Sequence, residues 1–372
     1  MRLPLSGRTT RTGGYEVGPT GYTRERSRRE ETGLGTDGTG GVPPCAAGAG
    51  AEAGQEPSDP FVHLASFYRD ERQYVDGTVS FAREGLAAGE AVALAVPGER
   101  LRLVRGALGA DAGRVRLLDM REAGRNPGRI IPGVLHKFAD TQPEGRRVRI
   151  VGEPVWPGRS AREYPACAQH EALINAAFRG RAVTILCPYD ERRLPERALV
   201  DARATHPVVI PAGSRARRPS GAYAPEEVVA RYNVPLPLVT GALTLPFVAG
   251  TLTRVRHAAA DEGRRLGLTG MRLEDLALAA AELTTNSVVH GGGTGVLRVW
   301  ADGGDVLCEV RDRGRLIDPL AGRRPPVRGR SGGRGLLLVH LIADLVRVHT
   351  GKEGTTIRCW FARRGRGTES GR

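Results

Sequence analysis

The chain has 372 residues, which is enough for two domains and additional segments, and its 26% charged and 40% hydrophobic residues fit a soluble globular protein. The net charge is +14, but only Lys137 and Lys352 are lysines, and the arginines are spread along the chain without a nucleic-acid-binding motif. No apolar run reaches the ~18–20 residues of a membrane span, and the first residues lack the apolar core of a signal peptide. We therefore expect a cytoplasmic protein that binds neither nucleic acid nor a membrane directly.

Residues 1–57 are rich in glycine, threonine, arginine and glutamate and have almost no apolar periodicity, so we predict that they are disordered. From Phe61 onward, amphipathic segments alternate with continuous apolar runs. The predicted helices are 79–89, 99–109, 132–141 and 164–178, and the predicted strands are 91–96, 114–119, 147–153 and 182–190. This alternation indicates an α/β domain with a parallel sheet, which we place at residues 58–210.

Residues 211–240 form the predicted linker, because their centre is rich in arginine, proline, serine and glycine. A second domain is predicted at 241–364, and a tail at 365–372. Its predicted elements are helices at 247–266, 274–290 and 334–346, strands at 296–302 and 305–312, a loop at 315–333, and a second hairpin around the sequence GKEG at 351–354. The pair Gly303-Gly304 is a tight hairpin signal. The order indicates an α+β domain with helices on one face of an antiparallel sheet.

The five cysteines are Cys45, Cys167, Cys187, Cys308 and Cys359, and no two of them form a CxxC pair. Scattered cysteines without such a pair argue against a zinc site or a thioredoxin-like site and are typical of reduced thiols in the cytosol. Cys308 and Cys359 alternate with polar neighbours in strand-like runs, so we expect both to be small core residues.

Polar side chains form a stripe along the helix predicted at 274–290. Glu282, Asn286 and His290 are spaced at i, i+4 and i+8, while Leu283 and Ser287 face the core instead. A neutral amide beside a carboxylate suits Mg²⁺, which takes oxygen ligands and keeps several waters. Glu282 would then lie one turn away, where it can orient or deprotonate a nucleophile. Taken alone, such a stripe is more commonly a solvated helix face.

Three short segments after this helix also have a chemical interpretation. Asp312 and Gly314 end a strand, where a carboxylate can accept the exocyclic amine of adenine and a glycine lets the base approach the backbone. The segment from Ser331 to Leu336 opens a helix with three glycines, so its free N–H groups form an anion site. Thr355 begins the last strand, where its hydroxyl can support the adenine side. Each segment alone also reads as an ordinary turn or hairpin end.

The loop between these segments adds positive charge. Residues 311–334 carry eight arginines against two acids, which favours a triphosphate by long-range attraction. No GK[ST] sequence follows the glycines, so the segment is not a Walker motif.

Together, ELTTNSVVH (282–290), DRG (312–314), GGRGL (332–336) and GTTI (354–357) resemble the N box, G1 box, G2 box and final threonine of the GHKL (Bergerat-fold) ATPases. Within that superfamily the chain looks like the anti-sigma-factor serine/threonine kinases. The resemblance implies the following roles: Asn286 holds Mg²⁺, Glu282 is the candidate general base, Asp312 reads adenine with Gly314 against it, Gly333, Arg334 and Gly335 close the lid, Thr355 supports the adenine, and His290 and Leu336 complete the cofactor-binding set.

In the first domain, GEPVWPGRS (152–160), HEALIN (170–175), CPYD (187–190) and THP (205–207) resemble the MEDS-type sensory domain, a RecA/KaiC-like sheet without a phosphate loop. Polar or aromatic residues that would line a pocket there are His63, Tyr68, Glu153, Trp156, Glu171 and Asn175. The favoured interpretation is that these residues only stabilise the fold. The resemblance names no ligand.

The sequence thus predicts a cytoplasmic regulator that uses ATP and Mg²⁺ to phosphorylate a Ser or Thr of an antagonist protein, controls a sigma factor and works as a homodimer. One alternative is a non-catalytic module in which ATP only supports partner binding. A less favoured alternative is a histidine kinase, because the surroundings of His257 lack the His-Glu-x-x-x-Pro pattern of a phosphoacceptor helix.

Overall fold

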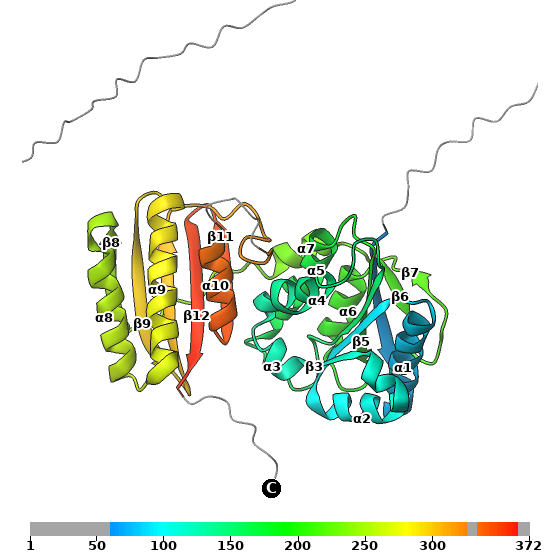
Figure 1. Ribbon diagram of the computed structural model, residues 1–372. Coiled ribbons are helices and arrows are strands. Elements are labelled where there is room, and N and C mark those ends of the chain that lie inside the picture. Colours follow the sequence, from blue (N-terminus) through cyan, green and yellow to red (C-terminus); the bar gives the residue numbers. More distant parts are fainter. Residues whose placement is uncertain (1–59, 326–332, 364–372) are drawn as a thin grey trace, which may run out of the picture. The chain divides into compact units, whose positions relative to one another are not determined.

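The computed structural model describes residues 60–325 and 333–363 (Figure 1). The predictions of disorder at 1–57 and of a tail at 365–372 lie outside these residues, as do Ser331 and Gly332 of the glycine-rich segment. Two sheets are present in the described residues, one of seven strands and one of five.

The first sheet has the strand order β3-β2-β4-β5-β1-β6-β7. Its strands are β1 (Val62–Tyr68), β2 (Ala91–Val96), β3 (Arg116–Asp119), β4 (Val148–Gly152), β5 (Val183–Asp190), β6 (Val208–Ile210) and β7 (Arg218–Pro219). All neighbours pair in parallel except β7, which is antiparallel to β6. Every residue of β2 and β5 is buried, as continuous apolar strands require in a sheet that is covered on both faces. The predicted parallel α/β fold is confirmed.

Helices cover both faces of this sheet. They are α1 (Glu71–Ala87), α2 (Gly98–Leu108), η1 (Gly109–Arg114), α3 (Met120–Ala123), η2 (Pro127–Arg129), η3 (Ile131–His136), α4 (Lys137–Ala139), α5 (Tyr164–Ala177), α6 (Glu196–Thr205) and α7 (Pro225–Arg231). Apolar residues of α1 and α2 share one core with one face of the strands. Residues of η3, α5 and α6 share a second core with the opposite face, which is the usual arrangement of an α/β sheet.

The structure differs from the predicted elements of this part in several places. The first helix begins at Glu71, because the Asp70 carboxylate caps it by accepting from the Gln73 N–H at 2.8 Å. Strand β1 and helix α6 have no predicted counterpart, and the helix predicted at 132–141 is a π-helical turn followed by a short α-helix. Within the predicted linker, β7 pairs with the sheet and α7 packs against α5 and α6.

The second sheet is antiparallel throughout, with the order β11-β12-β10-β9-β8. Its strands are β8 (Leu243–Val248), β9 (Thr294–Asp302), β10 (Asp305–Asp312), β11 (Leu345–Gly351) and β12 (Gly354–Ala362), and the helices are η4 (Ala249–Thr251), α8 (Leu252–Arg265), α9 (Gly270–His290) and α10 (Arg334–Ile342). Helices α8, α9 and α10 lie on one face of the sheet (Figure 1) and share its core, which confirms the predicted α+β sandwich. Cys308 and Cys359 lie opposite each other in this core, as expected.

Two predicted helix boundaries in this part fall inside strands, and α9 begins at Gly270, four residues before its predicted start. The helix predicted from 247 is preceded by strand β8, whose alternation of half-buried, exposed and buried residues is that of an edge strand. The helix predicted at 334–346 ends at Ile342, because Ala343 has an extended backbone and leads into β11. Both misplaced boundaries join a helix to a strand, where apolar residues continue across the junction.

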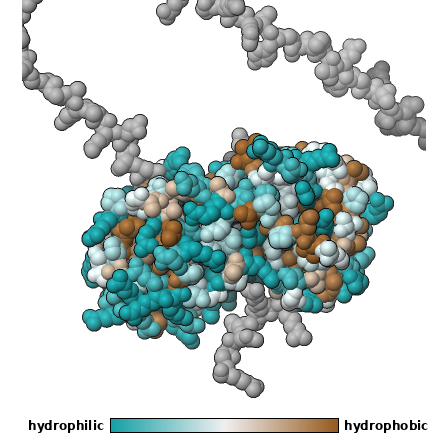
Figure 2. All heavy atoms as spheres, turned by 180° about the vertical axis from the view of Figure 1, so that it is seen from behind, coloured by the Kyte–Doolittle hydropathy of each residue, from teal (hydrophilic) through white to brown (hydrophobic). Residues whose placement is uncertain are grey.

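None of the helices in the described residues is long and apolar enough to cross a membrane. Figure 2 shows that hydrophilic residues cover much of the visible surface, while hydrophobic residues lie in small patches between them.

Gly354 is the tightest backbone position in the second sheet. Its φ angle is +116°, and a Cβ there would lie 1.9 Å from the Asp312 carbonyl oxygen on the neighbouring strand. We therefore expect Gly354→Ala to lower the free energy of unfolding by more than about 2 kcal/mol, measured by chemical denaturation. The control is Gly304→Ala in the β9–β10 turn, where nothing lies within 4 Å of an added Cβ and the change should stay within about 0.5 kcal/mol. Equal effects of the two substitutions would contradict the steric argument.

Candidate functional site

A cavity of about 360 Å³ lies between α9, the end of β10, the start of α10 and β12. Its wall contains Leu283, Asn286, Ser287, His290, Gly291, Val310, Asp312, Gly314, Arg315, Leu316, Asp318, Ala321, Gly322, Gly333, Leu336, Thr355 and Ile357. Seven of the ten predicted site residues are therefore in one cavity: Asn286, His290, Asp312, Gly314, Gly333, Leu336 and Thr355. Glu282, Arg334 and Gly335 are not part of its wall.

Glu282 lies next to the cavity, against the first turn of α10. A Cβ on Gly335 would lie 2.3 Å from Glu282 Oε2 and 3.4 Å from Asn286 Nδ2, so both polar side chains of α9 face this glycine. The absence of a side chain at Gly335 is what gives the Glu282 carboxylate its space. Helical spacing thus places the carboxylate and the amide one turn apart, both half-buried, on the side of α9 that faces α10.

The Asp312 carboxylate is held in one orientation at the end of β10. Ser287 Oγ donates to Asp312 Oδ2 at 2.6 Å, and the Gly314 N–H donates to Asp312 Oδ1 at 2.8 Å. A Cβ on Gly291 would lie 2.5 Å from the Asp312 carboxylate carbon, and a Cβ on Gly314 would lie 2.6 Å from the Gly291 Cα. The two glycines therefore let the end of α9 and the end of β10 come together around this carboxylate.

Ser287 was not predicted as a site residue, because its place in the helix pattern assigns it to the core. Ser287 is buried, as expected, but its hydroxyl on α9 donates a hydrogen bond to Asp312 at the end of β10. A hydroxyl at a core-facing position, one residue after Asn286, was the only signal available in the sequence.

Thr355 organises the segment that follows Asp312. Its Oγ1 donates to the Gly314 carbonyl oxygen at 2.8 Å and accepts from the Leu316 N–H at 3.2 Å, and Thr350 Oγ1 lies 2.9 Å away. Thr355 is opposite Asp312 in the β10–β12 register, so one buried hydroxyl connects two strands and the following loop. Thr350, its partner on β11, had no sequence signal.

The N-terminus of α10 meets the same cavity. Gly333 has a φ angle of +76° and is the N-cap of the helix, and as a glycine it has no side chain to cap the first N–H groups. Arg334 is exposed, whereas Leu336 is buried and contributes apolar wall. The site therefore combines apolar walls, an oriented carboxylate, a carboxamide and a helix N-terminus, which suits a ligand with a flat donor-bearing ring and an anionic group.

Five of the six polar or aromatic residues singled out in the first domain belong to two separate buried groups, and Trp156 lies apart from both. Tyr68 and Glu153 belong to a buried ionic group in which Arg100 lies 2.5 Å from Glu153 Oε1 and bonds to the Tyr68 hydroxyl, and the Tyr74 hydroxyl donates to Glu153 at 3.0 Å. Burial raises the pKa of Glu153 to about 8, against the opposing effect of Arg100.

Three of the other four residues form a second buried group. His63 Nε2 is 3.4 Å from Glu171 Oε2, and His63 Nδ1 is 3.2 Å from Asn175 Oδ1. Trp156 is apart from both groups and carries the Arg159 guanidinium over its ring at 4.0 Å.

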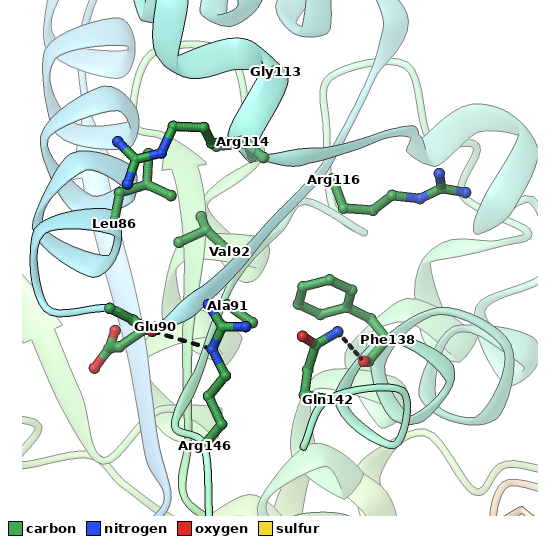
Figure 3. A pocket seen from close by; sticks show the side chains of 12 residues that line it. Leu86, Glu90, Ala91, Val92, Gly113, Arg114, Arg116, Phe138, Gln142 and Arg146 are labelled. Carbon is green, nitrogen blue, oxygen red and sulfur yellow. Dashed lines mark hydrogen bonds between the residues drawn. The ribbon is translucent and has the colours of Figure 1, made fainter.

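A cavity of about 530 Å³ does exist in this part, at the start of β2, but none of the six residues lines it (Figure 3). Figure 3 shows Arg114 and Arg146 beside it, and Arg146 Nε donates to the Gly89 carbonyl oxygen at 3.1 Å. The six residues therefore do not form one group, because strand positions on different faces of the sheet cannot share one cavity, and this arrangement fits the alternative that they stabilise the fold.

Comparison with known proteins agrees with this division of the chain. Residues 62–207 match the model of the MEDS family, the MEthanogen/methylotroph, DcmR Sensory domain, and residues 245–361 match the model of the histidine kinase-like ATPase domain. The chain thus carries a MEDS domain followed by an ATPase domain of this type.

Among solved structures, the chain is similar to the crystal structure of the RsbU and RsbW domains of Rv1364c from Mycobacterium tuberculosis, with 21% identity and a TM-score of 0.25. The match covers 32% of this chain and 32% of that one, so this chain spans about a third of that structure's length. No curated protein matches the chain.

The bonds of Thr355 predict how the site responds to loss of its hydroxyl. Thr355→Val keeps the shape of the side chain but leaves the Gly314 carbonyl oxygen without this donor, while the Leu316 N–H keeps its bond to Thr350 Oγ1 at 3.0 Å, so we expect a loss of about 1–3 kcal/mol of stability. Thermal and chemical unfolding of the variant measure it. The control is Thr356→Val on the same strand, which should change stability by less than about 0.5 kcal/mol, and a similar loss in both variants would rule out a special role for Thr355.

Proposed function

We propose that this protein, in which a MEDS domain precedes a histidine kinase-like ATPase domain, binds Mg-ATP in the α9–α10 cavity and phosphorylates a Ser or Thr of an antagonist protein. In this proposal, phosphorylation controls the availability of a sigma factor in response to a signal at the MEDS domain. The protein acts in the cytoplasm and as a homodimer. The observation that carries the proposal is the convergence of Asn286 and Asp312 on one cavity at the N-terminus of α10, with Glu282 beside it against Gly335.

The cavity fits the nucleoside part of ATP in size and chemistry. Its volume of about 360 Å³ is within the usual range of small-molecule sites, roughly 300–1,000 Å³. Leu283, Val310 and Ile357 supply apolar wall for a base, and Asp312 presents a carboxylate for its amino group. Because Ser287 and the Gly314 N–H already donate to Asp312, the carboxylate is oriented before a base binds.

The polar residues beside α10 fit the triphosphate and its cation. Asn286 would hold Mg²⁺ through its side-chain oxygen, in keeping with the preference of this ion for oxygen ligands and retained water. When bound, Mg²⁺ would neutralise charge on the phosphates. The first N–H groups of α10 and the nearby Arg315 and Arg334 would attract and orient the same anionic groups.

Glu282 is the residue we assign to the hydroxyl of the antagonist. Its carboxylate lies at the first turn of α10, one helical turn from Asn286, where it would accept the proton of an attacking Ser or Thr hydroxyl. Exposed His257 on α8 lacks a phosphoacceptor motif, and we assign it no role.

Transfer of γ-labelled phosphate from ATP to the cognate antagonist tests the proposal. Glu282→Gln should lower the transfer rate by about 10²–10⁴-fold and leave ATP affinity nearly unchanged, because the amide keeps the shape of the side chain but accepts no proton. Asn286→Ala should abolish Mg²⁺-dependent transfer, and ATP affinity is measured by titration calorimetry. Label on the antagonist should be acid-stable.

Three outcomes would count against the proposal. Tight ATP binding without transfer to any antagonist would identify a non-catalytic module instead. Acid-labile label would indicate a histidine kinase. Absence of ATP binding by the wild type would refute the nucleotide site itself.

Gly335 offers an independent test of the position of Glu282. The Cβ of Gly335→Ala would displace Glu282 Oε2, which is the end of a flexible side chain, so stability should change by less than about 1 kcal/mol while transfer falls at least about tenfold. Melting temperature and label transfer are measured on the same preparation. The control Gly250→Ala lies in open space before α8 and should preserve both. Full activity of Gly335→Ala would contradict the assignment of Glu282.

A further inference from the structure

Four side chains with metal-binding atoms converge in the core of the MEDS domain, and none of them belongs to the ATPase domain. His63 lies on β1, Glu171 on α5, Cys187 on β5, and His206 directly after α6. One ligand atom of each lies within 4.8 Å of the others. All four side chains are at most 2% exposed. The group therefore sits between the sheet and the two helices that cover this face.

Three distances within the group match those of a tetrahedral ligand set, and the remaining ligand atoms lie within 4.8 Å of one another. His63 Nε2 and His206 Nε2 each lie 3.4 Å from Glu171 Oε2, and Cys187 Sγ lies 3.5 Å from His63 Nε2. A tetrahedral Zn²⁺ with bonds of about 2.0–2.3 Å separates its ligand atoms by roughly 3.3–3.8 Å. The side chains are thus spaced as a bound cation would space them.

Hydrogen bonds on the far side of each imidazole determine which nitrogen faces the group. His206 Nδ1 is 2.7 Å from the Ala202 carbonyl oxygen, which only accepts, so this nitrogen carries the proton. The Asn175 amide nitrogen donates to the Thr205 carbonyl oxygen at 2.8 Å, which leaves its Oδ1 to accept from His63 Nδ1 at 3.2 Å. Both Nε2 atoms therefore present lone pairs to Glu171, as in metal-binding histidines that donate through the other nitrogen.

The group contains more acceptors than donors. In the described part of the chain, neither carboxylate oxygen of Glu171 has a hydrogen-bond partner, and neither does His206 Nε2. The donors beside these acceptors are the Cys187 thiol and the buried Tyr189 hydroxyl, which also contacts Glu171. Buried polar atoms without partners are costly, and a cation would satisfy them together.

We propose that His63, Glu171, Cys187 and His206 bind one divalent cation of intermediate softness, and that Zn²⁺ is the ion that fits. Nitrogen, sulfur and oxygen ligands in a tetrahedral set are those of zinc. On binding, the Cys187 thiol releases its proton, and the thiolate and the Glu171 carboxylate balance the two positive charges, so the buried site is neutral. Four protein ligands leave no open position, which makes the site structural and not catalytic.

The absence of a CxxC pair led us to expect no zinc site. The proposed site differs from that expectation because it uses a single cysteine together with two histidines and a glutamate. The four ligands come from four separate elements, and no two are close in the chain. A bound ion would join β1 and β5 to α5 and the end of α6, so its binding would stabilise this face of the domain.

Metal content of the full-length protein is the direct test. The protein is purified without chelators or ATP, dialysed and analysed by mass spectrometry for elements, and about one zinc per chain is expected. After removal of the metal with a chelator and refolding with Co²⁺, the spectrum should show tetrahedral Co²⁺ bands and a thiolate-to-cobalt charge-transfer band. Removal should also lower the melting temperature of the MEDS domain.

A pair of cysteine variants locates the site. Cys187→Ser should lose the charge-transfer band and bind zinc at least about tenfold more weakly, since even groups outside the ligand set change affinity by ~10–100-fold. Cys167→Ser is the matched control, because Cys167 is equally buried on α5 but is not in the group, and it should keep the band.

Folded wild-type protein that takes up neither Zn²⁺ nor Co²⁺ would overturn the proposal and identify the group as a hydrogen-bonded core cluster. Zinc without a thiolate–cobalt band, or a band lost in Cys167→Ser and kept in Cys187→Ser, would also overturn it. If Cys187→Ser does not fold, the metal content and cobalt spectrum of the wild type decide. None of these measurements depends on ATP, so they are independent of the kinase assay.

Discussion

The close approach of α9, β10 and β12 around Asp312 is the constraint on which the ATPase site depends. Gly291, Gly314 and Gly354 meet at this point, and each would place a Cβ within 2.6 Å of a neighbouring atom. With no side chains there, Ser287 reaches the carboxylate from the helix and Thr355 reaches the following loop from the next strand. Backbone proximity thus comes first, and the orientation of Asp312 follows from it.

The two halves of the described chain use buried polar groups in different ways. In the ATPase domain, hydroxyls and a carboxylate surround an open cavity and satisfy one another in pairs. In the MEDS domain, charged side chains and imidazole rings are buried between the parallel sheet and the helices that cover it. One group, around Arg100 and Glu153, is satisfied internally, whereas the group around Glu171 has acceptors without donors. This difference is what separates a structural ion pair from a candidate metal site.

Periodicity predicted most of the elements because their burial patterns are simple. Strands β2 and β10 have the bounds that the sequence predicted, and helix α5 ends one residue before its predicted end. Strand β8 and helix α6 were missed, since β8 is an edge strand with weak alternation and α6 is a short helix between polar turns. The end of α10 was misplaced because Leu345 and Val346 continue its apolar pattern although they belong to a strand.

The sequence by itself determined the order of the chemical groups: a carboxylate and an amide one helical turn apart, then an aspartate, glycines before a helix and a threonine. Those spacings depend only on local geometry, which a helix or a strand end imposes on its own residues. Only the tertiary structure decided that Ser287 and Thr350 support the site, that Tyr68 and His63 belong to different groups, and that His206 and Cys187 meet Glu171. Such contacts join residues far apart in the chain, and packing between elements, not spacing along the chain, creates them.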